Sequence, residues 1–267
     1  MGSPSPFSPE DLDEWLQFAG ELAGAAAAVT THYFRRNPST QIKADASPVT
    51  LADQETEQVL REMIREYYPH HGILGEEMGS ENMQADFCWV IDPIDGTRAF
   101  MTGIPTYVTL IGLAYQGRPI LGIIDQPHLR ERWSAAAGRP TQYNGEPVKP
   151  IMEAPETLAE ATMGTTASLL FPDHAMPAFL RLNKATRQTI NGGDGYLYGR
   201  LASGAPHLVC EYGLKPHDFC ALVPVIEQAG GKVTDWQGQP FTLQSDGSML
   251  AAVTAELHAL ALAVLQN

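Results

Sequence analysis

The most informative segment of the sequence places two carboxylates beside a proline and a glycine. Residues 89–100 read WVIDPIDGTRAF, an apolar run followed by Asp92, Asp95, Gly96 and Thr97. Pro93 fixes one backbone angle between the two aspartates, so both carboxylates can turn toward one point while the Ile94 carbonyl stays free as a further ligand. Oxygen-only ligands suit Mg²⁺, and the segment therefore predicts a magnesium site.

The residues after the two aspartates predict a phosphate site. Gly96 and Thr97 stand where a helix is expected to begin. The first turn of a helix has unpaired N–H groups and the positive end of the helix dipole, which favour a bound anion. A metal ion and a phosphate would then meet at one corner. An ordinary turn is the alternative for this segment taken alone.

Two further acidic positions are candidates for the same site. Glu76 follows the short apolar run 73–74, with Glu77 as its neighbour, and the alternative is a solvated acidic loop. Asp218 follows Pro216 at an expected helix start, so it is either a cap or a fourth acidic ligand delivered by the second half of the chain.

Asp53 and Lys43 lie upstream of these acidic residues. Thr50 and Asp53 fit a helix-capping box, and Asp53 could additionally face the metal. Lys43 could meet a substrate phosphate, and an exposed lysine is the alternative.

The apolar pattern predicts the elements that position these groups. Helices are expected over 10–34 and 50–68, and strands over 87–92, 107–115, 120–125 and 132–136. Short turns between these strands imply antiparallel pairing. After a turn at 144–145, helices are expected over 173–184, 196–202, 216–229 and 255–265.

These elements predict an α+β fold, with an antiparallel sheet in the first half and mixed α/β structure in the second. We expect two halves, 1–145 and 146–267, that share an extensive interface with the active site between them. Pro224 should kink the helix expected over 216–229.

The composition limits the class of protein. A net charge of −14 argues against nucleic acid or an anionic membrane as a partner, because phosphate-backbone binding depends on clustered Lys and Arg. No apolar run approaches the roughly 18–20 residues of a membrane span, and no leader pattern stands at the N-terminus, so a cytoplasmic protein is expected. The three cysteines, Cys88, Cys210 and Cys220, suggest reduced, packed thiols.

Together the motifs resemble the inositol monophosphatase superfamily of magnesium-dependent, lithium-sensitive phosphatases. The matching segments are TLAD at 50–53, GEE at 75–77, DPIDGT at 92–97, and Asp218 followed a helix later by AGG at 229–231. Their order and spacing span residues 9 to 265. The resemblance implies alternating helix and sheet layers and a homodimer.

The resemblance also implies roles for the site residues. Two or three Mg²⁺ ions would be held by Glu76, Asp92, Asp95, Asp218 and the Ile94 carbonyl. Gly96 and Thr97 would hold the phosphate, and Thr97, Asp53 and Glu76 would orient and deprotonate the attacking water. In such metal-assisted hydrolysis no protein nucleophile is required.

Within the superfamily, several segments look most like the histidinol-phosphate phosphatase branch. They are IDQP at 124–127, RERW at 130–133, GGDGY at 192–196 and EYGLKPHD at 211–218. His217 stands where an inositol-directed member more often has Trp. The expected substrate contacts are Asp95, Asp194, Glu211 and Lys43. Asp194 and Glu211 match family positions that line the substrate pocket, and their carboxylates would suit the ammonium and imidazole groups of histidinol.

The expected reaction is therefore the hydrolysis of histidinol phosphate to histidinol and phosphate, in histidine biosynthesis. An inositol-1-monophosphatase or a phosphatase of broad specificity is the alternative within the superfamily. A turn between glycines is the alternative for Asp194.

Other classes fit less well. Haloacid-dehalogenase-type phosphatases separate two aspartates by one residue and use the first as a nucleophile, whereas two residues separate Asp92 from Asp95. The pair His217-Asp218 suggests a His-Asp metal phosphohydrolase, but no set of partner histidines accompanies it. An inactive metal-binding interaction module is disfavoured because every expected acidic position is present.

Overall fold

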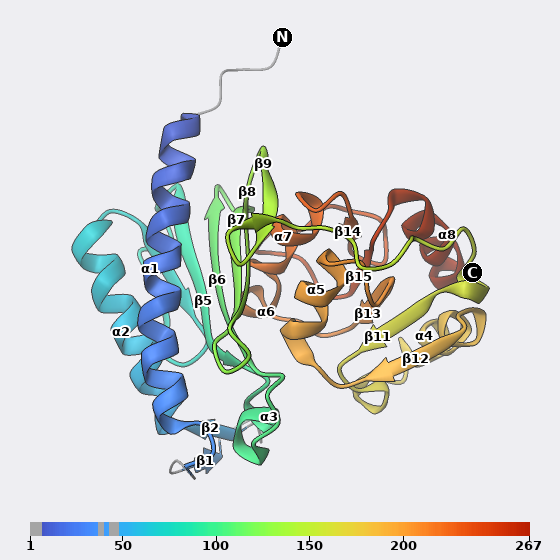
Figure 1. Ribbon diagram of the computed structural model, residues 1–267, viewed down its shortest axis with the longest axis horizontal. Coiled ribbons are helices and arrows are strands. Elements are labelled where there is room, and N and C mark those ends of the chain that lie inside the picture. Colours follow the sequence, from blue (N-terminus) through green and yellow to red (C-terminus); the bar gives the residue numbers. More distant parts are fainter. Residues whose placement is uncertain (1–6, 37–39, 43–47) are drawn as a thin grey trace.

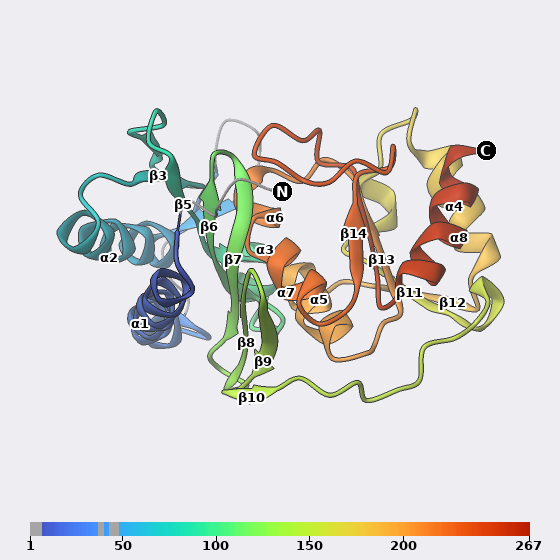
Figure 2. The same cartoon turned by 90° about the horizontal axis from the view of Figure 1, so that it is seen from above.

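The computed structural model describes residues 7–36, 40–42 and 48–267. Helix layers and sheet layers alternate across the molecule, as Figures 1 and 2 show from two directions. Helices α1 and α2 form one outer layer, α4 and α8 form the other, and α5, α6 and α7 lie between the two large sheets. The predicted α+β class with alternating layers is confirmed.

The first outer layer consists of α1 (Pro9–Tyr33) and α2 (Leu51–Tyr67). Both helices start within one residue of their predicted positions because local sequence caps them. Ser8 Oγ accepts a hydrogen bond from the Asp11 N–H (3.1 Å), and the Asp11 carboxylate accepts one from the Ser8 N–H (2.7 Å). The apolar stripe of α1 packs on the sheet, with Phe18, Leu22 and other residues buried.

The larger sheet has the strand order β10-β9-β8-β7-β6-β5-β3-β4. Its strands are β3 (Gly72–Gly75), β4 (Gly79–Glu81), β5 (Phe87–Asp95), β6 (Val108–Tyr115), β7 (Arg118–Gln126), β8 (Glu131–Ala136), β9 (Arg139–Tyr143) and β10 (Glu146–Pro147). The predicted antiparallel pairing of β5, β6, β7 and β8 is confirmed, whereas β3 runs parallel to β5. A separate two-stranded sheet pairs β1 (Thr40–Ile42) with β2 (Pro48–Thr50).

Strand β5 is longer than predicted. It continues past Asp92 to Asp95, and its register with β6 shifts between these two residues. The irregular stretch contains Pro93, which has no N–H for the ladder. Both aspartates are therefore delivered by one strand end.

The middle layer contains α5 (Asp194–Ala202), α6 (Pro216–Phe219) and α7 (Leu222–Glu227), whereas the short helix α3 (Thr97–Thr102) follows β5 and lies beside β2. The single helix predicted over 216–229 is wrong, because it breaks between α6 and α7. The break packs against the larger sheet: a Cβ on Gly112 would lie 2.7 Å from Cys220 Sγ, and one on Gly122 would lie 2.0 Å from the Ala221 carbonyl oxygen. The break lies four residues before Pro224, whose missing N–H leaves the Cys220 carbonyl without a helical partner, so the helix is interrupted where the predicted effect of Pro224 falls.

The smaller sheet has the order β12-β11-β13-β15-β14 and mixes parallel with antiparallel pairs. Its strands are β11 (Thr162–Thr165), β12 (Gln188–Asn191), β13 (Leu208–Glu211), β14 (Lys232–Thr234) and β15 (Met249–Ala252). Helices α4 (Met176–Ala185) and α8 (Ala255–Gln266) cover its outer face, within three residues of their predicted bounds.

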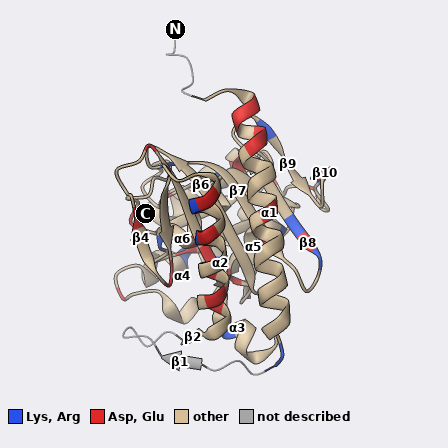
Figure 3. Cartoon of the chain, turned by 90° about the vertical axis from the view of Figure 1, so that its left-hand side faces the viewer, with Lys and Arg blue, Asp and Glu red and all other residues tan. Residues whose placement is uncertain are grey.

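Acidic residues mark the outer helix layer. Figure 3 shows Asp and Glu along the visible sides of α1 and α2, and α1 contains no Lys or Arg. Within residues 7–36, 40–42 and 48–267, no helix has the length and apolar character needed to cross a bilayer. The three cysteines are buried and unpaired.

Candidate active site

Acidic side chains from both parts of the chain converge beside the end of β5. One ligand atom from each of Asp92, Asp95 and Asp218 lies within 4.8 Å of the other two. A second group with the same spacing joins Asp92 to Glu76 and His217. Strand β5, the turn after β3 and helix α6 thus bring together the four carboxylates that the sequence predicts as ligands.

The cluster is electrostatically unfavourable without a counter-charge. Burial raises the pKa of Asp92 well above its usual range, and the nearby Glu76 and Asp95 carboxylates raise it further. Burial does the same to the pKa of Asp95, with Asp194 and Asp218 adding to the shift. Buried carboxylates that repel one another fit a site for hard divalent cations, because the positive charge of the ions would offset the repulsion.

Local contacts shape the turn between the two aspartates. The Ile94 N–H donates to Asp92 Oδ1 (3.1 Å), and the Pro93 carbonyl accepts from Thr109 Oγ1 (2.8 Å). The Ile94 carbonyl is not free as predicted, because it accepts a hydrogen bond from Thr97 Oγ1 (3.1 Å). A carbonyl oxygen has two lone pairs, so one remains available to a ligand.

Gly96, the N-cap residue of helix α3, adopts the left-handed backbone conformation, with φ of 82°. A Cβ at this position would lie 2.9 Å from Asp194 Oδ2, so glycine also permits the close approach of the second half of the chain. The helix start at Thr97 is confirmed. Phosphate binding by Gly96 and Thr97 stays a prediction.

Asp53 completes the predicted capping box of α2, and its role toward the metal stays a prediction. Its Oδ2 accepts hydrogen bonds from the Thr50 N–H (2.7 Å) and from Thr50 Oγ1 (2.5 Å), which completes the capping box of α2. Its Oδ1 is buried and has no hydrogen-bond partner in the described part of the protein. Burial, assisted by the charge of Glu76, raises the pKa of Asp53 to about 6 although the Thr50 hydrogen bonds oppose the shift. An orphaned buried oxygen beside Glu76 fits an acceptor for a metal-bound group.

The predicted substrate contacts Asp194 and Glu211 lie in a pocket with two of the metal candidates. A cavity of about 210 Å³ is lined by Asp95, Asp218, Asp194 and Glu211. Burial raises the pKa of Asp194 to about 6 and that of Glu211 to about 7. Glu211 also accepts a short hydrogen bond from the Thr166 N–H. Lys43, the remaining predicted contact, lies outside the described residues.

His217 is a candidate that the prediction left out of the ligand set. The sequence predicts its neighbour Asp218 as a ligand, but the lack of partner histidines argues against a His-Asp metal phosphohydrolase. The structure supplies carboxylate partners, Asp92 and Glu76. The adjacent pair His217-Asp218 at the start of α6 was the available signal, since neighbouring residues in a first helical turn can both reach one cluster.

Comparisons with known proteins agree with this arrangement. Residues 11–267 match the model of the Inositol monophosphatase family. The chain is 45% identical over 251 residues to the "Bifunctional phosphatase IMPL2, chloroplastic" of Arabidopsis thaliana, covering 93% of this chain and 72% of that protein. It is 34% identical over 239 residues to a histidinol-phosphatase of Chlorobaculum parvum, covering 88% of this chain and 91% of that protein.

A solved structure shares the whole fold. An inositol monophosphatase from Zymomonas mobilis superimposes with a TM-score of 0.87 at 40% identity, covering 98% of this chain and 100% of that one. An inositol-1-monophosphatase of Synechocystis is 31% identical over 249 residues, covering 92% of this chain and 86% of that protein. Both substrate names therefore occur among the relatives.

Proposed function

Because the chain belongs to the inositol monophosphatase family, whose members are metal-dependent phosphatases, we propose that it is a Mg²⁺-dependent histidinol-phosphate phosphatase. The substrate assignment depends on one observation: the pocket contains carboxylates proposed as metal ligands together with further carboxylates that can contact the leaving group. Asp95 and Asp218, two of the proposed metal ligands, line the same pocket as Asp194 and Glu211. Histidinol has an ammonium and an imidazole group, which these acids can recognise, whereas inositol is neutral.

The proposed metal ligands are the carboxylates of Glu76, Asp92, Asp95 and Asp218 and the carbonyl of Ile94, around two or three ions. Bound Mg²⁺ would supply a water of lowered pKa and charge to stabilise the phosphate and the leaving oxygen. The Thr97 hydroxyl donates a hydrogen bond to the Ile94 carbonyl, so its oxygen lone pairs remain able to accept a hydrogen bond from a water.

Asp53 and Glu76 are the proposed proton acceptors. Asp53 Oδ1 has no hydrogen-bond partner in the described structure, which leaves this oxygen able to receive a proton. Burial raises the pKa of Asp53, which strengthens this carboxylate as a proton acceptor. Gly96 and Thr97 are proposed to bind the phosphate at the start of α3.

The second candidate function is an inositol-1-monophosphatase, which is supported by relatives of that name. A comparison of phosphate release from four esters, each with and without Mg²⁺, separates the candidates. The esters are histidinol phosphate, inositol monophosphate, fructose 1,6-bisphosphate and adenosine 3',5'-bisphosphate. A strong preference for histidinol phosphate is expected. A preference for inositol monophosphate would transfer the assignment to the second candidate.

Four broader expectations are proposals of the same kind. They are a homodimer, a cytoplasmic location, inhibition by lithium, and the division into halves 1–145 and 146–267. A mass measurement in solution and an inhibition curve with LiCl test the first and the third directly.

A further inference from the structure

Backbone hydrogen bonds hold the turn that contains Glu76, both at this residue and at the next one. Glu76 stands in the three-residue connection between β3 and β4, whose strand pairing ends at Gly75 and Gly79. The Glu76 N–H donates to the Ile91 carbonyl of β5 (3.3 Å). The next N–H, that of Glu77, donates to Glu57 Oε2 (2.7 Å). Both peptide groups that flank the Cα of Glu76 are therefore fixed, and they determine where its side chain starts.

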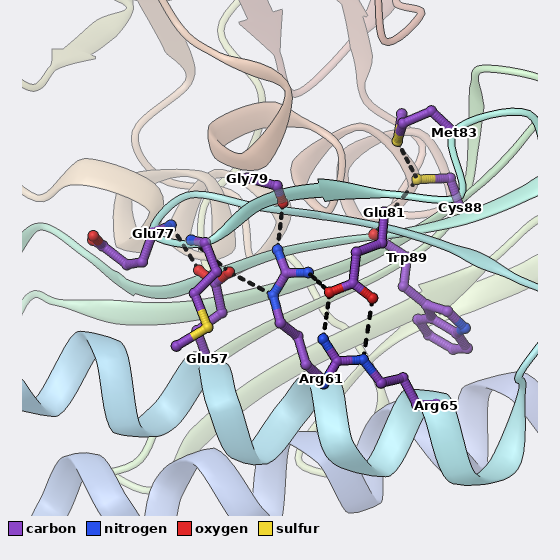
Figure 4. Close-up of polar contacts among 10 residues, drawn as sticks. Glu57, Arg61, Arg65, Glu77, Gly79, Glu81, Met83, Cys88 and Trp89 are labelled. Carbon is purple, nitrogen blue, oxygen red and sulfur yellow. Dashed lines mark hydrogen bonds and ion pairs between the residues drawn. The ribbon is translucent and has the colours of Figure 1, made fainter.

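Glu57 is buried, and both of its carboxylate oxygens accept hydrogen bonds from this turn (Figure 4). Besides the Glu77 N–H, it accepts the Met78 N–H on Oε1 (3.0 Å). Arg61, one helical turn further along α2, donates Nε to the same Oε1 (2.8 Å). Glu57 thus pairs its charge with Arg61 and uses both oxygens to hold the residues directly after Glu76.

Arg61 adds hydrogen bonds to strand β4, on the other side of the hairpin. It is 1% exposed and donates Nη1 to Glu81 Oε1 (2.9 Å), and its Nη2 makes a short hydrogen bond to the Gly79 carbonyl. Figure 4 shows the guanidinium lying between α2 and the hairpin, with Arg65 closing the contact at Glu81. Glu57 and Arg61 together bind the turn, its exit and strand β4.

Gly75 shows how tightly the carboxylate is inserted. A Cβ on this residue would lie 2.1 Å from Glu57 Oε1, so the carboxylate occupies the space that any side chain would take. Asp53, Glu57 and Arg61 are spaced by four residues and share one face of α2. One helix face therefore presents Asp53 to the site and holds the turn of Glu76 beside it.

We propose that Glu57, paired with Arg61, is a positioning residue that sets the direction of Glu76 for metal binding. The inference rests on the proposed role of Glu76 as a metal ligand. A buried ion pair is a poor device for stability alone, because the cost of removing two charges from water offsets much of their attraction. Its hydrogen bonds go to the backbone N–H groups of the two residues after Glu76, so Glu57 acts on the direction of this side chain through the main chain. Hydrogen bonds from groups behind a metal ligand are known to fix its orientation.

The test compares Glu57→Gln with Glu62→Gln in the full-length chain. Both variants make the same chemical change on α2, but Glu62 is exposed: it accepts a hydrogen bond from Gln58 (3.0 Å) and its charge acts on Arg65, whereas Glu57 is buried against the turn. Calorimetric titration with Mn²⁺ alone measures metal affinity without catalysis. The Mg²⁺ dependence of phosphate release and the thermal unfolding of the metal-free protein are measured on the same samples.

We expect Glu57→Gln to weaken Mn²⁺ binding and to raise the Mg²⁺ concentration for half-maximal activity by about 10-fold. The KM for the ester at saturating Mg²⁺ should change little, and Glu62→Gln should match the wild type. Should Glu57→Gln fail to fold, Glu57→Asp retains the charge beside Arg61 while withdrawing the carboxylate from the turn, and the same shift is expected.

Mn²⁺ affinity equal to that of the wild type in a folded Glu57 variant overturns the proposal, even if thermal stability falls. Failure of the proposed function gives a different result. In that case the wild type releases no phosphate from any ester with Mg²⁺, while the calorimetric comparison still decides the role of Glu57.

Discussion

The Gly195 N–H of α5 donates a short hydrogen bond to the Asp95 carboxylate at the end of β5. The two residues are 100 positions apart in the sequence, and the contact joins the middle helix layer to the strand that carries the acidic pair. A Cβ on Gly195 would lie 2.6 Å from Asp95 Oδ2 and 2.9 Å from Val108 Cγ2. The position of Asp95 therefore depends on a residue of the second half that has no side chain.

Gly195→Ala should therefore impair the enzyme through Asp95. The added methyl group must displace the carboxylate, and a misplacement of about 1 Å at a reacting site can cost about 100-fold in rate. Steady-state kinetics at several Mg²⁺ concentrations measure the loss of kcat/KM. Gly24→Ala on α1 is the matched control, since its Cβ would meet no atom within 4 Å. Equal activity of the two variants would show that Asp95 tolerates the displacement.

Asp92→Asn should stabilise the metal-free protein while weakening its response to Mg²⁺. Asp92 is 1% exposed, and Glu76 and Asp95 oppose its charge, so removing that charge relieves repulsion. A gain of about 1 kcal/mol would raise the Tm by about 2–4 °C for a chain of this size. Thermal unfolding is followed with EDTA and with saturating Mg²⁺.

The wild type should gain more stability from Mg²⁺ than the Asp92 variant does, because binding to the folded state alone stabilises it. Glu256→Gln, which removes an exposed charge on the outer helix α8, controls for the change in net charge. A wild type whose Tm is insensitive to Mg²⁺ would argue against a metal site in this cluster.

Glu211→Gln and Asp194→Asn should discriminate against the charged substrate. Both side chains line the pocket beside Asp95 and Asp218, and a lost charge-assisted hydrogen bond corresponds to about 10- to 100-fold in affinity. The KM for histidinol phosphate should rise by this order, while the KM for an ester with an uncharged leaving group should change much less. Similar increases for both esters would remove these carboxylates from substrate recognition.

Acidification should destabilise the fold through His258. This buried histidine of α8 forms a hydrogen bond between Nε2 and Thr234 Oγ1 (3.0 Å), and burial lowers its pKa to about 4. The unfolded chain, with a histidine pKa of about 6.5, binds the proton first, so stability falls as the pH drops from about 6.5 toward 4. Between pH 6.5 and 5 the loss from this group is at most about 2 kcal/mol.

Urea unfolding at pH 7 and at pH 5 measures this effect. His258→Gln should be less stable than the wild type at pH 7 but should lose less stability on going to pH 5. His32→Gln is the control, because His32 lies on an exposed part of α1. Identical pH dependence in the wild type and the His258 variant would show that another group carries the acid sensitivity.

The parts of the fold that could be predicted are those specified by neighbouring residues. Helices α1 and α2 were placed within one residue because capping residues and apolar periodicity are local signals. Asp92 and Asp95 were recognised because Pro93 and Gly96 stand between and after them in the sequence.

Other features depend on contacts between distant segments. The strands of the smaller sheet are three or four residues long, and β11, β13 and β15 are buried throughout, so they show no alternating pattern. The break after α6 arises where Cys220 and Ala221 meet glycines of another layer. Glu57 looks like an ordinary helix residue in the sequence, and only the hairpin packed against it shows what its carboxylate contacts.

The central claim is that this pocket selects histidinol phosphate and hydrolyses it with Mg²⁺. The most direct measurement is the ratio of kcat/KM for histidinol phosphate to that for inositol 1-phosphate, determined at saturating Mg²⁺. A ratio of at least about 100 is predicted, since buried acids left without their cationic partners disfavour the neutral polyol. A ratio near or below 1, or hydrolysis that persists unchanged in EDTA, would contradict the account.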